Sequence, residues 1–330
     1  MFKIRIVSMA LLSIVFVSLK SHADSNADEK NIKLKNLSLL LDWKPNTNHI
    51  GFYVAKNKGF YSQYGIQLKI LNPTQTTATA LVGTGKADFG ISYANDLIYA
   101  RNAHVPIVSL AGIIQKDSSC FVWRTNSKIK SIKDLEGKRY GGWGSPEENA
   151  TLKYIFEKNG AQFNKLKILT TGAQDFLPAT LKNVDFTWEY RAWNILAAEL
   201  KGVSVGTYCP NEHFSELNKP SPLVITSENK IKREPDLVKN FMKATSLGFE
   251  FAIQNPEQAA KILIEEVPEL EGNLVNASTK MLSSMFQADA PKWGYQSESR
   301  FEAYAGWMKK VDLIQQIPKA SEYLDNSFLP

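Results

Sequence analysis

The stretch that decides the fold is residues 37–65, LSLLLDWKPNTNHIGFYVAKNKGFYSQYG. Its first five residues hold four leucines, a run as short as a strand and apolar enough to be buried on both faces of a sheet. The run stops at the polar turn 42–46, and apolar residues then recur at helical spacing until Gly59, a residue type that favours helix ends. The stretch therefore predicts a strand, a turn and an amphipathic helix.

The turn after this strand is expected to be a binding edge. Ligands of open α/β sheets bind outside the carboxyl ends of the strands, where helix N-termini offer free N–H groups. Asp42 and Trp43 stand at this place, so we expect both side chains to point into a cleft. The alternative is that Trp43 is ordinary core and Asp42 only forms the turn.

Strand and helix patterns alternate beyond this stretch and predict an α/β fold with a mostly parallel sheet. Strands are expected at 67–71 and 107–114, and a further short strand ends near Ile91. The helix that follows Ile91 has Ser92 or Asn95 as its candidate N-cap. We expect Tyr93 and Asp96 of this second strand-to-helix junction to face the same cleft as Trp43.

A glycine-rich turn, YGGWGSPEE at 140–148, opens another helix. Ser145 is expected to cap this helix, with Pro146 at its first position and Glu148 completing a capping box. These residues have a structural role under that interpretation. Alternatively, the amides of Gly144 and Ser145 bind an anionic or carbonyl group of a ligand.

A dense aromatic segment, DFTWEYRAW at 185–193, is the second distinctive stretch. Strand alternation assigns Phe186 to the core, and Trp188, Tyr190 and Trp193 are candidates for the cleft. Glu189 either accepts hydrogen bonds from a ligand or pairs with Arg191 at the rim, for little gain in stability.

The pattern DWxPNxxHxGxYxAxxxGFY at 42–61 resembles the start of the THI5-like branch of periplasmic solute-binding proteins. Segment 185–193 resembles the VDFxWxxxxW segment of its pyrimidine-precursor binders, although Glu189 and Arg191 stand where many members have apolar or aromatic residues. Members supply ABC importers with thiamin pyrimidine precursors, and relatives handle riboflavin precursors or sulfonates. The resemblance adds Asn46 and His49 to the expected ligand contacts.

The resemblance implies a two-lobed, type II periplasmic-binding-protein fold with a hinge and a central ligand cleft. Lobe 1 is expected at 24–118 and 212–330, and lobe 2 at 119–211. The implied function is capture of a formylaminopyrimidine or hydroxymethylpyrimidine by cleft closure and its delivery to an ABC permease and its ATPase, without a cofactor. A riboflavin-precursor, sulfonate or nitrate binder of the same fold is the alternative within transport.

An enzyme is the alternative of another class, since the eukaryotic branch of the family makes the thiamin pyrimidine with a Lys-bound pyridoxal phosphate. Aligning its GLKxxxH-like segment with residues 90–96 places Ser92 at the Lys and Asp96 at the His, and the branch's Cys-rich cluster has no counterpart. The sequence therefore favours a binding protein over a pyrimidine synthase.

The N-terminal residues 1–23 combine a basic start, an apolar run and small residues before Asp24, which predicts a cleavable signal peptide and export to the periplasm. The formal net charge is +6 and the lysines are scattered, so nothing indicates nucleic acid. Cys120 and Cys209 are the only cysteines, and either a bridge near the hinge or two buried thiols fits them. No Cys/His pair has the spacing of metal ligands.

Overall fold

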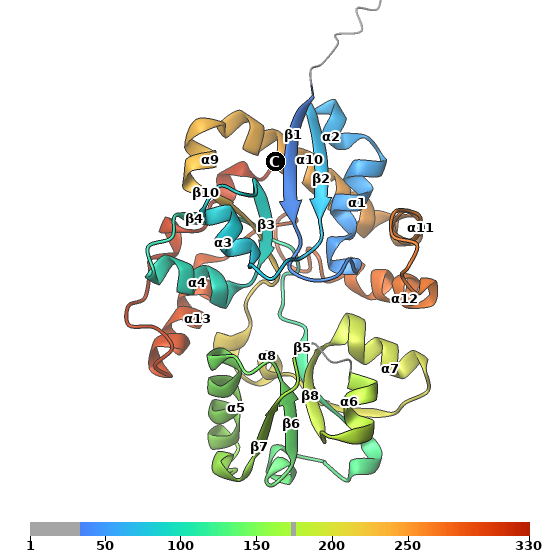
Figure 1. The fold of residues 1–330 in the computed structure, drawn as a ribbon, viewed down its shortest axis with the longest axis vertical. Coiled ribbons are helices and arrows are strands. Elements are labelled where there is room, and N and C mark those ends of the chain that lie inside the picture. The colour runs from blue at the N-terminus through green and yellow to red at the C-terminus, as the bar shows by residue number, and fades with distance from the viewer. Residues whose placement is uncertain (1–33, 173–175) are drawn as a thin grey trace, which may run out of the picture. The chain divides into compact units, whose positions relative to one another are not determined.

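The computed structural model of the chain describes residues 34–172 and 176–330 (Figure 1). The predicted signal peptide, residues 1–23, lies outside the described residues. Within the described ranges, no helix combines the length and the apolar character needed to cross a membrane.

The first of two sheets is built around the strand predicted from the leucine run. Its strand order is β2-β1-β3-β10-β4, and β1 runs parallel to β2 and β3. The last crossing of the chain brings β10 back antiparallel to both β3 and β4. The other four strands all run in the same direction, which confirms the expectation of a mostly parallel sheet. The strands are β1 (Lys35–Leu40), β2 (Ile66–Leu71), β3 (Phe89–Ser92), β4 (Ile107–Gly112) and β10 (Leu223–Ser227).

Helices cover both faces of this sheet, which confirms that β1 is buried on both sides. Leu39 lies in one apolar core with Phe52 of α1 and Phe249 of α10, whereas Leu40 lies in another core with Leu97 of α4 and Phe301 of α13. The helices of this part are α1 (Ile50–Asn57), α2 (Phe60–Gln63), α3 (Ala78–Gly83), α4 (Ala94–Asn102), α9 (Glu228–Arg233), α10 (Pro235–Gln254), α11 (Pro256–Glu266), α12 (Gly272–Ser283) and α13 (Glu298–Lys310). We call the first sheet and these helices lobe 1.

The backbones of α1 and α10 approach each other closely at Gly51 and Gly248. A Cβ atom on Gly248 would lie 2.0 Å from the carbonyl oxygen of Gly51, so a larger residue cannot occupy this position without separating the two helices. This contact fixes the position of α1, which follows the turn at 42–46 with its candidate site residues.

The second sheet has the strand order β7-β6-β8-β5-β9, in which β6 is parallel to β7 and β8, and β5 is antiparallel to β8 and β9. Its strands are β5 (Ser119–Arg124), β6 (Arg139–Gly142), β7 (Lys167–Thr170), β8 (Phe186–Tyr190) and β9 (Val205–Tyr208). Its helices are α5 (Pro146–Lys158), α6 (Phe176–Lys182), α7 (Leu196–Leu200) and α8 (Pro210–His213), with a π-helical turn at Arg191–Ile195. We call this part lobe 2. Two sheets with helices confirm the α/β class, and the residue borders predicted for the lobes stay a prediction.

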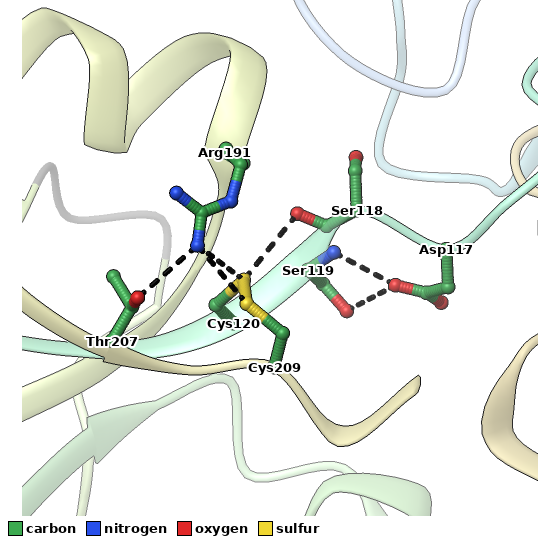
Figure 2. Close-up of a disulfide and its surroundings, with 7 residues drawn as sticks. All are labelled: Asp117, Ser118, Ser119, Cys120, Arg191, Thr207 and Cys209. Carbon is green, nitrogen blue, oxygen red and sulfur yellow. Dashed lines mark hydrogen bonds between the residues drawn. A yellow bond between two sulfur atoms is a disulfide. The ribbon is translucent and has the colours of Figure 1, made fainter. Parts of the chain in front are cut away.

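A disulfide joins the points at which the chain enters and leaves the second sheet (Figure 2). Cys120 in β5 pairs with Cys209, which directly follows β9, and both cysteines are buried. The Arg191 guanidinium lies beside the bridge, with one nitrogen 3.3 Å from Cys209 Sγ and 3.1 Å from Thr207 Oγ1. The structure therefore has the bridge rather than two thiols, and it gives Arg191 a place against the sulfur atoms.

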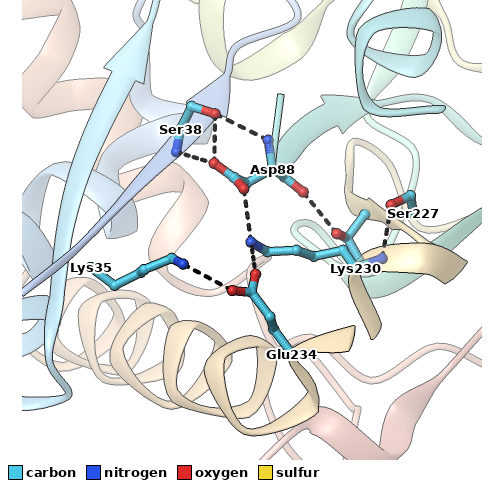
Figure 3. A network of polar contacts seen from close by, with 7 residues as sticks. Lys35, Ser38, Asp88, Ser227, Lys230 and Glu234 are labelled. Carbon is cyan, nitrogen blue, oxygen red and sulfur yellow. Dashed lines mark hydrogen bonds and ion pairs between the residues drawn. The ribbon is translucent and has the colours of Figure 1, made fainter. Parts of the chain in front are cut away.

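A polar network joins β1 to the start of β3 and to α9 (Figure 3). The carboxylate of Asp88 accepts hydrogen bonds from the amide and the hydroxyl of Ser38 at 2.8 and 2.9 Å, and Lys230 Nζ lies 2.9 Å from its other oxygen. Burial alone would raise the pKa of Asp88, but the contacts with Lys230 and Ser38 hold it below its ordinary value. The network fixes the alignment of β1 and β3, whose carboxyl ends carry the candidate site.

Candidate ligand-binding site

The turn after β1 is held by a buried pair of side chains. Asn46 caps the short helix Thr47–His49, and its backbone N–H donates to Nδ1 of His49 at 3.3 Å. The proton of the neutral ring therefore sits on Nε2, which donates to Oδ1 of Asp42 at 2.8 Å. Asp42, Asn46 and His49, three of the expected ligand contacts, thus lie together, and each of them is hydrogen-bonded within the protein.

A chain of polar side chains leads from Asp42 towards lobe 2. Tyr93 donates to Oδ2 of Asp42 at 2.5 Å, and Tyr190 of lobe 2 lies near enough to Tyr93 to affect its pKa. Burial alone would raise the pKa of Asp42, but its contacts with His49 and Tyr93 hold it below its ordinary value. Burial and the nearby negative charges raise the pKa of both tyrosines, so the chain carries its single negative charge on Asp42.

Asp96 lies in the first turn of α4, close to this chain. Burial and the charge of Asp42 raise its pKa to about 6. The predicted caps of α4 are wrong, because the N-cap position belongs to Tyr93 and has no side-chain cap, while the hydroxyl of Ser92 pairs with Thr79 at 2.7 Å. Asn95 instead donates to Asp96 at 3.1 Å.

The glycine-rich turn before α5 is organised by Glu148. Ser145 caps the helix as predicted, accepting from the amide of Glu148 at 3.1 Å. The Glu148 carboxylate does not complete a capping box. It turns back to accept from the amides of Trp143 and Gly144 at 3.1 and 2.7 Å and from the hydroxyl of Tyr140 at 2.5 Å. The amide of Gly144 is therefore occupied, which favours the structural interpretation of this turn.

Gly142 makes room for that arrangement. A Cβ atom at this position would lie 2.2 Å from Glu148 Oε1 and 2.5 Å from a ring carbon of Tyr140. The glycine therefore has a packing role, and it lets a charged carboxylate approach the backbone of the turn.

A cavity of about 30 Å³ brings three predicted site residues together: Trp43 of lobe 1 and Trp188 and Glu189 of lobe 2. We call it the front cavity. Glu189 is buried in its wall and accepts a hydrogen bond from Asn194. The remaining lining residues are Gly141, Gly142, Trp143, Thr171, Gly172, Thr187 and Asn194.

Trp143 and Thr187 are among the lining residues of the front cavity that reasoning from the sequence missed. Trp143 is 58 % exposed although it lines the cavity. The glycines around it in the sequence were the feature that could have identified it as a cavity residue. Thr187 is buried, and its Oγ1 has no hydrogen-bond partner among the described residues. Strand alternation gave no reason to choose this threonine. By contrast, Trp193 lies outside the lining and packs against the core of lobe 1.

A larger cavity, about 710 Å³, is an open groove beside β2, α1 and α11, lined by residues such as Tyr53, Lys56 and Glu266. It holds none of the predicted site residues. In residues 34–172 and 176–330, no group of three His, Cys, Asp or Glu side chains is placed to bind a metal ion.

The chain is similar to known proteins over most of its length. A family model described as NMT1/THI5 like matches residues 46–259. The formylaminopyrimidine-binding protein of Halalkalibacterium halodurans is 24 % identical over 94 % of this chain and 95 % of that protein. A 4-amino-5-hydroxymethyl-2-methylpyrimidine phosphate synthase of Legionella pneumophila is 23 % identical over 89 % of this chain and 92 % of that protein.

Solved structures confirm the fold. The alkanesulfonate-binding protein SsuA from Xanthomonas axonopodis pv. citri matches with a TM-score of 0.65 at 13 % identity, over 88 % of this chain and 98 % of that one. A Candida albicans protein described as having the generic periplasmic binding protein fold matches with a TM-score of 0.62 at 13 % identity, over 89 % and 97 %. The chain therefore has the periplasmic-binding-protein fold.

Proposed function

Because the chain belongs to the NMT1/THI5-like family, we propose that it is the substrate-binding component of an ABC importer and that its ligand is an amino-substituted pyrimidine. The proposed ligands are compounds of the formylaminopyrimidine and hydroxymethylpyrimidine type. The predicted signal peptide supports export to the periplasm, where the protein would deliver the ligand to a permease and its ATPase.

One observation carries this proposal: two indoles, one from each lobe, line the same cavity together with a carboxylate. Trp43 and Trp188 offer flat apolar faces, and a stacked aromatic pair contributes roughly 1 kcal/mol beyond the burial of area. Glu189 lines the same cavity, and its carboxyl group is of the kind that accepts hydrogen bonds from an exocyclic amino group. This combination suits a flat heterocycle that donates hydrogen bonds.

Contacts between the lobes support binding by closure. Tyr93 and Tyr190 lie near each other on the side of Asp42, and Tyr304 of α13 donates to Glu147 of α5 at 3.1 Å. A ligand that touches both lobes would shift the population toward this closed arrangement, because only there are both indoles in reach.

The charge of the site argues against the sulfonate and nitrate alternatives. A small anion needs Arg, Lys or free helix N-terminal amides. The front cavity has no cationic side chain among its described lining residues, and Glu189 adds a carboxyl group. The amide of Gly144, the candidate anion donor, is already bound by Glu148. A sulfonate would therefore meet a carboxyl group and no cationic side chain among the described lining residues.

The synthase alternative is favoured by similarity to several synthases, among them the Legionella enzyme at 23 % identity. Its chemistry would need a lysine for pyridoxal phosphate at the position of Ser92, whose hydroxyl is bound to Thr79. The residues at this position do not fit that group, since a serine has no amine to form the Schiff base. Adding pyridoxal phosphate should therefore produce no absorbance band of a protein-bound Schiff base.

The test of the proposed function is a binding screen of the protein without residues 1–23. Formylaminopyrimidine, hydroxymethylpyrimidine, thiamin, riboflavin, taurine and nitrate are compared by thermal shift, since a ligand of the folded state raises the unfolding midpoint. Titration calorimetry then gives the affinities. Of these compounds, only pyrimidines should raise the unfolding midpoint. A rise of the midpoint with only taurine or nitrate would refute the proposal.

A further inference from the structure

A second, smaller cavity shares Trp188 with the front cavity. It has a volume of about 10 Å³ and lies among the segment before β5, the start of α5, α8 and the chain that returns to lobe 1. We call it the inner cavity. Its polar lining residues include Asp117, Glu147, Thr151, Trp188, Asn211 and Lys219.

Two polar atoms of this lining are buried and have no hydrogen-bond partner among the described residues. One is a donor, Nε1 of Trp188, and the other is an acceptor, Oδ1 of Asn211. Buried polar groups in folded proteins are nearly always paired, so a pair of unmatched atoms at one small cavity indicates an occupant. The occupant must accept one hydrogen bond and donate another.

The charged side chains of the inner cavity already have partners in the protein. Lys219 Nζ lies 2.9 Å from Asp117 Oδ2, with both side chains buried, and the ammonium lies 4.5 Å from the ring centre of Tyr304. Glu147 accepts from the hydroxyl of Tyr304 at 3.1 Å, and burial raises its pKa despite the nearby Lys219. An uncharged occupant therefore fits better than an ion, which would leave one charge unmatched.

The volume sets the size of the occupant. A volume of 10 Å³ accommodates about one water molecule, so the inner cavity holds either one water molecule or one oxygen atom of a larger group. Because Trp188 lines both cavities, a ring bound in the front cavity lies one side chain away from the inner one.

We propose that the inner cavity is a subsite for an uncharged, oxygen-bearing substituent of the heterocycle, such as a hydroxymethyl or formamido group. The oxygen of this substituent accepts from Trp188 Nε1, and its own O–H or N–H donates to Asn211 Oδ1. This inference rests on the proposed function, because it assigns the substituent of a ligand whose ring lies in the front cavity. Without the ligand, a water molecule takes the place of the oxygen.

The test compares two compounds that differ only in this substituent, 4-amino-5-hydroxymethyl-2-methylpyrimidine and 4-amino-2,5-dimethylpyrimidine. Titration calorimetry gives the ratio of their affinities for the wild type, Asn211→Leu and Trp188→Phe. The wild type should prefer the hydroxymethyl compound by about tenfold, the worth of one hydrogen bond in a buried site. Both variants should lower this ratio to about two or less.

Asn149→Leu is the matched control. Asn149 Oδ1 is also buried without a partner among the described residues, and it lies in α5 outside the lining of the inner cavity. This variant should keep the wild-type ratio. Each ratio is measured within one variant, so a general loss of folded protein does not change it.

The outcomes separate this inference from the proposed function. If the wild type binds neither compound, both the proposed function and the subsite are refuted. If it binds both but prefers neither, or if its preference survives Asn211→Leu and Trp188→Phe, only the subsite is refuted.

Discussion

Asp42 and His49 form a pair at the end of β1 that solvent hardly reaches: Oδ1 and Nε2 are 2.8 Å apart, and the side chains are 5 % and 0 % exposed. The other ring nitrogen of His49 is fixed by the amide of Asn46, so the ring has one orientation. Two residues expected to bind ligand therefore shape the turn that presents Trp43.

Replacing His49 by Phe should destabilise the protein by about 3 kcal/mol, because it leaves a buried carboxylate with only Tyr93 as its partner. Urea unfolding measures the loss. His213→Phe is the control, because His213 is exposed and stacks on Tyr208 as a phenyl ring also would. Equal unfolding free energies for His49→Phe and this control would show that the Asp42–His49 pair does not stabilise the protein.

Asp96 should make stability depend on pH. Its pKa in the folded protein is about 6, against an ordinary value of 3.8, so the folded state binds more protons between these values than the unfolded state. The stability gained from this protonation is full below 3.8 and is lost as the pH rises to about 6. Asp96→Asn should therefore be more stable than the wild type at neutral pH by about 1–3 kcal/mol, and equally stable in acid.

Urea unfolding at a series of pH values checks this prediction. Asp236→Asn serves as the control, since Asp236 also stands in the first turn of a helix but is exposed. A difference between Asp96→Asn and the wild type that stays constant from acid to neutral pH would contradict the raised pKa.

Local patterns predicted those parts of the fold that depend on neighbouring residues. The leucine run predicted a strand buried on both faces, and Leu39 and Leu40 do lie in different cores. The alternation of strand and helix patterns along the sequence predicted the α/β class. The antiparallel direction of β10 could not be predicted in this way, because it depends on how the chain returns after forming the whole second sheet.

In the candidate site, too, features set by neighbouring residues were predicted and those set by distant residues were not. The ends of two strands drew attention to Trp43 and Trp188, and both line the front cavity. The capping-box pattern correctly assigned Ser145 but misassigned Glu148, because the pattern considers only residues three positions apart. The hydroxyl of Tyr140, from the preceding strand, offers the carboxylate a further donor that local spacing does not reveal.

Replacing Gly142 by Ala should destabilise lobe 2 by about 1–3 kcal/mol, because the new methyl group would overlap Glu148 and force it from the amides of Trp143 and Gly144. Urea unfolding measures the change. Gly306→Ala in α13 is the control, since a Cβ atom there meets nothing within 4 Å and Ala favours a helix. If Gly142→Ala is as stable as this control, Glu148 is not confined as the structure indicates.

Removal of the disulfide should lower the unfolding free energy by about 2–4 kcal/mol, because the bridge closes a long loop of the unfolded chain. The variant with both Cys120 and Cys209 replaced by Ala is compared with the wild type in urea. Both sulfur atoms belong to residues that are at most 3 % exposed, so thiol reductants should cleave the bridge only under unfolding conditions. Rapid reduction of the folded protein would show that the loop around Arg191 opens readily.

Trp43→Ala and Trp188→Ala should each weaken binding of the pyrimidine by at least about tenfold, because each removes one aromatic wall of the front cavity. Calorimetry measures the affinities at temperatures where the variants stay folded, and Tyr295→Ala, a half-exposed aromatic outside the lining, is the control. If both indoles hold one ring, the two losses are coupled, and the double variant should lose less than the sum by about 0.5 kcal/mol or more. Independent, additive losses would mean that the two indoles do not share a ligand, and unchanged affinity in Trp188→Ala would remove that residue from the site.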